Sequence, residues 1–244
     1  MSAQRTTEST PITASQGDML AKSSGISDLM VHAMLFDEDN ERTDVTSTTQ
    51  LRIAHMGPPL GRATLTSDAI GRIDLSEDQK LRIRNFVAQC KDASDKRKKE
   101  YKKRRLKADP RELYVILPSA KSPTGDFAYR RFSCVGFVLK AYSDLKVVLL
   151  KGPFPERTLE ELKTFYPGFA EELDDANTRS AMGIGTGEHW PVELVGYLLH
   201  SFARSDTEVI AGPYTPQPGD EYFPRQSTSV GSHPRKWFGK KWKK

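Results

Sequence analysis

A single long helix between two apolar parts of the chain is the strongest structural signal in the sequence. Ser76 and Gln79 form the Ser-x-x-Gln pattern of a helix N-terminal capping box. Asp109-Pro110 is expected to end this helix, because proline disfavours helical geometry in the residue before it. The apolar residues at helical spacing are Ile83, Phe86, Val87 and Cys90. Since they all lie in the first half, we expect only that half to pack on a core.

The second half of this helix is strongly basic. Residues 96–107 contain nine Lys or Arg and one Glu, and residues 235–244 contain six basic residues and no acid. The net charge of the whole chain is only +5, so the remainder is mildly acidic. We expect the two basic segments to contact an anionic partner, either nucleic acid or a membrane surface. The alternative is a solvated helix face and a disordered tail.

The composition predicts one domain with extensions. The chain has 244 residues, of which 37% are hydrophobic. Residues 1–26 are polar, so we expect them to be disordered, and they lack the apolar core of a signal peptide. No apolar run approaches the length that spans a bilayer. The two cysteines, Cys90 and Cys134, suit a reducing, cytoplasmic setting.

Two short apolar runs, each with one histidine, are predicted to be strands. The first runs from Asp28 to Phe36 and contains His32, and the second runs from Gln50 to Met56 and contains His55. A third strand is expected over 113–117. The histidines are either functional or ordinary residues of the core and of a loop edge.

Cys134 begins a predicted buried helix over 134–142. A thiol at a helix N-terminus faces unpaired backbone N–H groups and the positive end of the helix dipole, and both favour the thiolate. The same N–H groups can hold an oxyanion. Arg130 and Arg131, just upstream, could add positive potential. The alternative is that Cys134 only packs in the core.

The segment from Ser133 to Tyr142 resembles the nucleophile segment of NlpC-type cysteine peptidases, which belong to the papain-like enzymes. The matching positions are Cys134, Gly136, Phe137, Val138, Ala141 and Tyr142, whereas Ser133 and Val135 depart from the pattern. The strand around His32 resembles the histidine strand of that family, with Met34 in place of the usual Gly.

The resemblance covers about residues 27–60 and 113–145, with histidine before cysteine. This order is similar to that of the lecithin:retinol acyltransferase-like branch, which is circularly permuted. The resemblance implies that Cys134 is the nucleophile, His32 the base and His55 the residue that orients His32. The implied activity is hydrolysis or acyl transfer at an amide or ester bond, with a peptide or acyl substrate and neither cofactor nor metal.

The implied fold is α+β, with a small antiparallel sheet packed on the Cys134 helix. We expect a papain-like domain over 27–150, in which 76–107 is the inserted helix. A helical and loop extension over 151–211 and a Pro-rich, basic tail over 212–244 would follow it.

Several alternatives remain open. His189 is a rival base, but the glycines before it and Pro191 after it predict a loop. His200 belongs to an amphipathic helix predicted over 191–203, and Cys90 lies on an apolar helix face. Because of the departures noted above, the chain could also be an inactive interaction module. It could equally be a nucleic-acid-associated protein in which Cys134 is only core.

Overall fold

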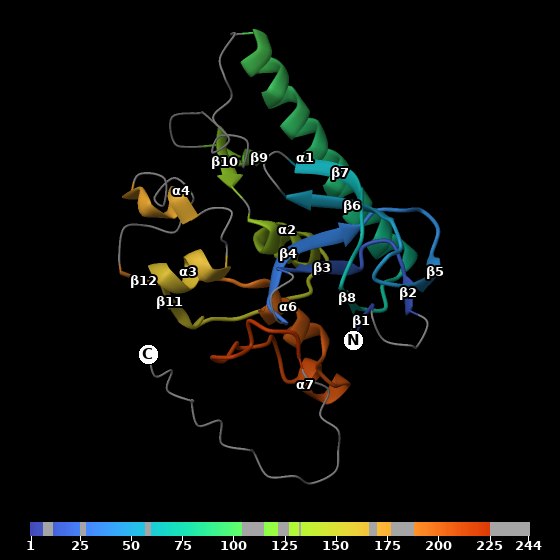
Figure 1. Ribbon diagram of the computed structural model, residues 1–244. Coiled ribbons are helices and arrows are strands. Elements are labelled where there is room, and N and C mark those ends of the chain that lie inside the picture. The colour runs from blue at the N-terminus through green and yellow to red at the C-terminus, as the bar shows by residue number, and fades with distance from the viewer. Residues whose placement is uncertain are drawn as a thin grey trace.

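The computed structural model describes residues 1–6, 12–24, 28–56, 60–103, 115–121, 127–131, 133–165, 170–176 and 188–224. Its centre is a six-stranded antiparallel sheet in the order β1-β8-β3-β4-β6-β7 (Figure 1). The strands of this sheet are β1 (Ser2–Arg5), β3 (Met19–Ser23), β4 (Met30–Phe36), β6 (Leu51–Met56), β7 (Leu60–Leu65) and β8 (Ala69–Arg72). Together with its helices, the sheet makes an α+β architecture, as predicted.

Alternating residues of the central strands fill two separate cores. Ala33 and Leu35 of β4 belong to a core with helices α1 (Glu77–Lys103), α2 (Cys134–Ser143) and α6 (Val195–Phe202). Met34 and Phe36 belong to a core that is closed by β2 (Ile12–Ala14) and β5 (Arg42–Val45). Both faces of β4 are therefore covered, because side chains of a strand point alternately to opposite faces.

The strongest local patterns of the sequence are confirmed. Strands β4 and β6 and helices α1 and α2 lie where they were predicted. The capping box is present, since the Gln79 N–H donates to Ser76 Oγ at 3.3 Å and the Ser76 N–H donates to Gln79 Oε1 at 2.9 Å. The predicted apolar face of α1 is buried. The ring of its Phe86 stacks on that of Phe137 of α2, with the ring centroids 5.4 Å apart. The distal half of the predicted helix is described as far as Lys103.

The prediction of disorder for residues 1–26 was wrong for the three strands β1, β2 and β3. Met19, Leu20 and Ala21 of β3 are fully buried, and β3 pairs with both β4 and β8. The polar composition concealed these strands, because the partners of β1 and β2 and one of the two partners of β3 lie far away in the sequence. Pairing with two neighbours satisfies the backbone groups of β3, so three apolar residues suffice to hold it in the core.

The hairpin of β9 (Val115–Lys121) and β10 (Phe127–Arg131) lies between α1 and α2 in the sequence. The strand predicted over 113–117 falls partly on β9, while residues 113 and 114 lie outside the described residues. Strand β10 was not predicted. It ends three residues before Cys134, so the hairpin leads directly into α2.

The region after α2 adds short elements. They are β11 (Glu156–Thr158), α3 (Leu159–Phe165), α4 (Ala170–Asp174), β12 (His189–Pro191) and α7 (Asp206–Ile210), besides α6. The helical extension predicted over 151–211 thus also contains a two-stranded sheet, β11 with β12. Within the part of the chain that the structure describes, no helix is long and apolar enough to cross a membrane.

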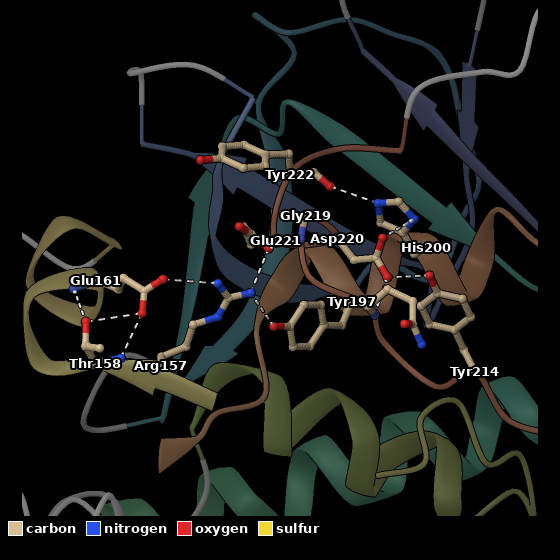
Figure 2. A network of polar contacts seen from close by, with 11 residues as sticks. Arg157, Thr158, Glu161, Tyr197, His200, Tyr214, Gly219, Asp220, Glu221 and Tyr222 are labelled. Carbon is tan, nitrogen blue, oxygen red and sulfur yellow. Dashed lines mark hydrogen bonds and ion pairs between the residues drawn. The ribbon is translucent and has the colours of Figure 1, made fainter. Parts of the chain in front are cut away.

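The first part of the predicted tail, residues 212–224, packs on the body. The Phe223 N–H donates to the Asp28 carbonyl oxygen at 2.9 Å, and Phe223 is buried beneath the Arg5 guanidinium. Figure 2 shows the adjoining polar network. There the buried Arg157 donates to the Glu221 carboxylate at 2.8 Å and to the Tyr197 hydroxyl at 2.9 Å. Paired in this way, Arg157 and Glu221 avoid the large cost of an isolated buried charge. Residues 225–244 lie outside the described residues.

Close backbone contact at Gly196 gives a test of this packing. A Cβ at Gly196 would lie 2.3 Å from the carbonyl oxygens of both Asp220 and Glu221, so the segment around them would have to move. We expect Gly196→Ala to lower the free energy of unfolding by about 2–4 kcal/mol. Urea denaturation followed by circular dichroism measures it. The control is Gly152→Ala, whose Cβ would meet only ordinary contacts from 3.6 Å. Equal stability of both variants would contradict the account.

Candidate functional site: Cys134 and the His32–His55 pair

Cys134 is the first residue of α2, and the local sequence explains why the helix begins there. Ser133 is the N-cap, and its Oγ accepts the N–H of Gly136 at 3.0 Å. Apolar side chains then bury the helix against the sheet; they are Val135, Phe137, Val138, Ala141 and Tyr142. The predicted position of the thiol at a buried helix N-terminus is confirmed.

Three backbone N–H groups surround the half-buried thiol of Cys134. Two belong to the helix N-terminus, at Cys134 and Val135, and the third belongs to Ala33 of β4. Each of them favours negative charge on sulfur. The contact with Ala33 brings the thiol to the residue that follows His32. Nothing in the local sequence around Ala33 signals this role, which arises from the packing of α2 on β4.

His32 and His55 lie on the neighbouring strands β4 and β6, where Met34 is the register partner of His55. His32 Nε2 lies 3.0 Å from His55 Nδ1, and the two rings meet edge to face. The predicted association of the two imidazoles is therefore present. Both rings are half-buried. The side chains of His32 and Cys134 are both described, and no hydrogen bond joins them.

Burial determines the charge state of all three groups. It lowers the pKa of His32 to about 4, with a further contribution from the adjacent His55, and it also lowers the pKa of His55. Burial raises the pKa of the Cys134 thiol, although the three backbone N–H groups oppose this effect. At neutral pH the site thus contains a thiol and two neutral imidazoles. The helix N-terminus does favour the thiolate, as expected, but the desolvation of the sulfur has the larger effect on the pKa of Cys134.

Lys22 is a neighbour of this site that the sequence did not reveal. It lies on β3 directly opposite His32 in the register. Its ammonium group donates to Asp68 Oδ1 and to Thr66 Oγ1, each at 2.9 Å. Because β3 was predicted to be disordered, no sequence signal connected Lys22 with His32.

The other candidate residues lie elsewhere. His189 is exposed on β12, so the prediction that it lies in a loop was wrong. His200 donates to the Tyr222 carbonyl oxygen and lies beside Asp220 (Figure 2). Cys90 is fully buried on α1, and burial raises the pKa of its thiol to about 12. Among the residues described, no three His, Cys, Asp or Glu side chains form a group that could hold a metal ion.

Comparison with known proteins identified no relative of this chain. No family model matches the sequence, and neither a curated protein nor a solved structure matches it.

The depressed pKa of His32 predicts a loss of stability in acid. Below about pH 6.5 the unfolded chain binds a proton at His32 that the folded protein does not bind until about pH 4. Proton binding to the unfolded chain therefore lowers the free energy of unfolding as the pH falls from 6.5 to 4. After a discount for partial exposure this decrease amounts to about 2 kcal/mol.

Comparison with His32→Gln isolates this contribution. Asp18 acts in the opposite direction, because burial raises its pKa to about 7 and its contribution is lost as the pH rises from 3.8. Urea unfolding of the wild type and of His32→Gln between pH 4 and 7 separates the two. We expect the difference in unfolding free energy to shrink by about 2 kcal/mol towards pH 4. A pH dependence in His32→Gln equal to that of the wild type would refute the assignment.

The raised pKa of Cys134 predicts slow alkylation at neutral pH. We expect the rate of labelling by iodoacetamide, measured by peptide mass spectrometry, to rise only above about pH 8.5, the value of a free thiol. Cys90→Ala removes the second thiol as background. Rapid labelling at pH 6 would show a preformed thiolate and contradict the neutral site.

Proposed function

We propose that the protein is a thiol-dependent hydrolase or acyltransferase acting on an amide or ester bond, with a permuted papain-like arrangement. The observation that carries this proposal is the contact between the Cys134 sulfur and the N–H of Ala33, the residue next to His32. It brings a helix N-terminal cysteine to the strand of a histidine that is itself paired with a second histidine. A nucleophile, a base and an orienting group are the three parts that such catalysis requires.

His55 determines which nitrogen of His32 serves as the base. When His32 Nε2 carries the proton and donates to His55 Nδ1, the lone pair of His32 lies on Nδ1. In the proposed reaction, Nδ1 is the atom that accepts the thiol proton. The hydrogen bond persists after His32 accepts a second proton, so His55 holds the ring of His32 in one orientation during the reaction.

The first half-reaction transfers the acyl group to sulfur. The Cys134 thiol gives its proton to His32 Nδ1 as sulfur attacks the carbonyl carbon of the substrate. The carbonyl oxygen gains the negative charge, and backbone N–H groups at the start of α2 stabilise it. Collapse of this intermediate expels the amine or alcohol, which takes the proton from His32, and leaves a thioester on Cys134.

The second half-reaction removes the acyl group from Cys134 and restores the free enzyme. Water, or the hydroxyl or amine of an acyl acceptor, gives a proton to His32 and attacks the thioester. The acyl group leaves as an acid or as the transferred product, and Cys134 recovers its proton from His32. With a pKa of about 4, the His32 imidazolium delivers protons readily, whereas neutral His32 is a correspondingly weak base towards the thiol.

A second candidate function is an inactive interaction module on the same fold. The neutral resting charges and the missing hydrogen bond between His32 and Cys134 favour it. The two candidates differ in one respect, which is whether an acyl group becomes attached to Cys134.

Trapping the acyl-enzyme separates the two candidates. Wild-type protein is mixed with an activated acyl ester, and intact mass spectrometry records the adduct together with the rate of ester hydrolysis. We expect one acyl group on Cys134 and none after Cys134→Ala. His32→Gln should slow acylation by roughly 10²–10⁴-fold, the usual range for loss of a general base, and His55→Gln should slow it less.

The control for this experiment is Cys90→Ala, which removes the thiol that lies outside the site. It is expected to acylate like the wild type, with circular dichroism to confirm that it folds. Lack of an adduct on the wild type, or an equal rate in His32→Gln, would favour the interaction module.

A further inference from the structure

The distal half of α1 extends beyond the rest of the fold. In Figure 1 the C-terminal end of this helix projects past the sheet and past the β9–β10 hairpin. Its buried residues end at Ser94, while Lys96, Lys99 and Lys103 are exposed. We call residues 96–103 the basic arm. It is a helix whose exposed side chains are available to a partner.

Basic residues occupy most backbone positions of this arm. Basic residues occupy positions 96, 97, 98, 99, 102 and 103, and Glu100 is its one acid. Because successive residues of a helix turn by about 100°, these positions are distributed around the whole circumference. Lys96 is partly neutralised by Asp92, at 2.7 Å. Like charges three or four residues apart, such as Lys99 and Lys103, destabilise a helix unless anions lie between them.

This distribution distinguishes between the anionic partners. A helix that binds a membrane surface needs an apolar face to insert, and the arm has only Tyr101 besides its charged residues. A nucleic-acid groove, in contrast, has phosphates along both walls and so matches a helix that is basic all round. The major groove of B-form DNA is about 12 Å wide and admits an α-helix, whereas the major groove of A-form RNA is too narrow.

We propose that the basic arm binds double-stranded, B-form DNA by entering the major groove and contacting the phosphates on both sides. An α-helix with its side chains is about 10–12 Å in diameter, which fits the width of about 12 Å of the groove. Lys96, Lys99 and Lys103 are exposed and can neutralise phosphates, so we expect the binding to depend on charge and not on sequence. It is independent of the chemistry at Cys134.

The test measures the binding of the full chain to a fluorescent 20-base-pair DNA duplex by anisotropy over a range of salt concentrations. The variant is Lys96→Gln/Lys99→Gln/Lys103→Gln. Its matched control, Arg42→Gln/Arg52→Gln/Lys151→Gln, removes three exposed positive charges elsewhere. For the wild type we expect affinity to fall steeply with salt. The arm variant should bind at least tenfold more weakly at 50 mM salt, and its slope of log affinity against log salt should be shallower by roughly 2–3, about 0.9 for each lost phosphate contact.

Three results would overturn the proposal. The first is equal weakening in the arm variant and the control, which would show a general charge effect. The second is unchanged binding by the arm variant, which would assign DNA binding to another part of the chain. The third is binding of duplex RNA, or of vesicles that contain phosphatidylserine, as tightly as duplex DNA. Circular dichroism of both triple variants confirms that a loss of binding is not a loss of folding.

Discussion

The packing of helix α2 on strand β4 is the constraint on which the candidate site depends. The helix is held at both ends. At its start the Cys134 sulfur lies near the N–H of Ala33, and at its end the Tyr142 hydroxyl donates to the carbonyl oxygen of Gly17 at 2.7 Å. Between them the apolar side chains of α2 are buried. The thiol therefore cannot move along the sheet without breaking a buried hydrogen bond, and its position relative to His32 follows from this packing.

The same burial that positions these groups also opposes their ionisation. Removing water from the thiol and from both imidazoles favours the neutral form of each. The backbone N–H groups at the start of α2 act against this on the sulfur side alone. In the proposed reaction, charge separation between Cys134 and His32 would arise only as sulfur attacks the substrate, so the carbonyl oxygen would share the new negative charge with those N–H groups.

The sequence predicts the elements with strong local patterns and misses those held by distant partners. Strand β4, helix α1 with its Ser76 cap, and helix α2 each contain their own signal, and so does the candidate trio of Cys134, His32 and His55. Strand β3 is different, because its partner β8 lies almost fifty residues further along the chain. The contact of Ala33 with sulfur, the position of Lys22 opposite His32, and the raised pKa of the thiol all arise from tertiary packing. No local pattern records them.

The order of the elements along the chain also determines when the molecule becomes complete during synthesis. The two histidine strands emerge from the ribosome early, whereas Cys134 follows about a hundred residues after His32. The carboxylate that pairs with the buried Arg157 comes later still, at Glu221. Because domains fold as their chains emerge, a nascent chain can assemble its paired imidazoles well before it contains Cys134. Until that last packed segment has been made, the buried Arg157 lacks the carboxylate of Glu221 with which it pairs in the finished protein.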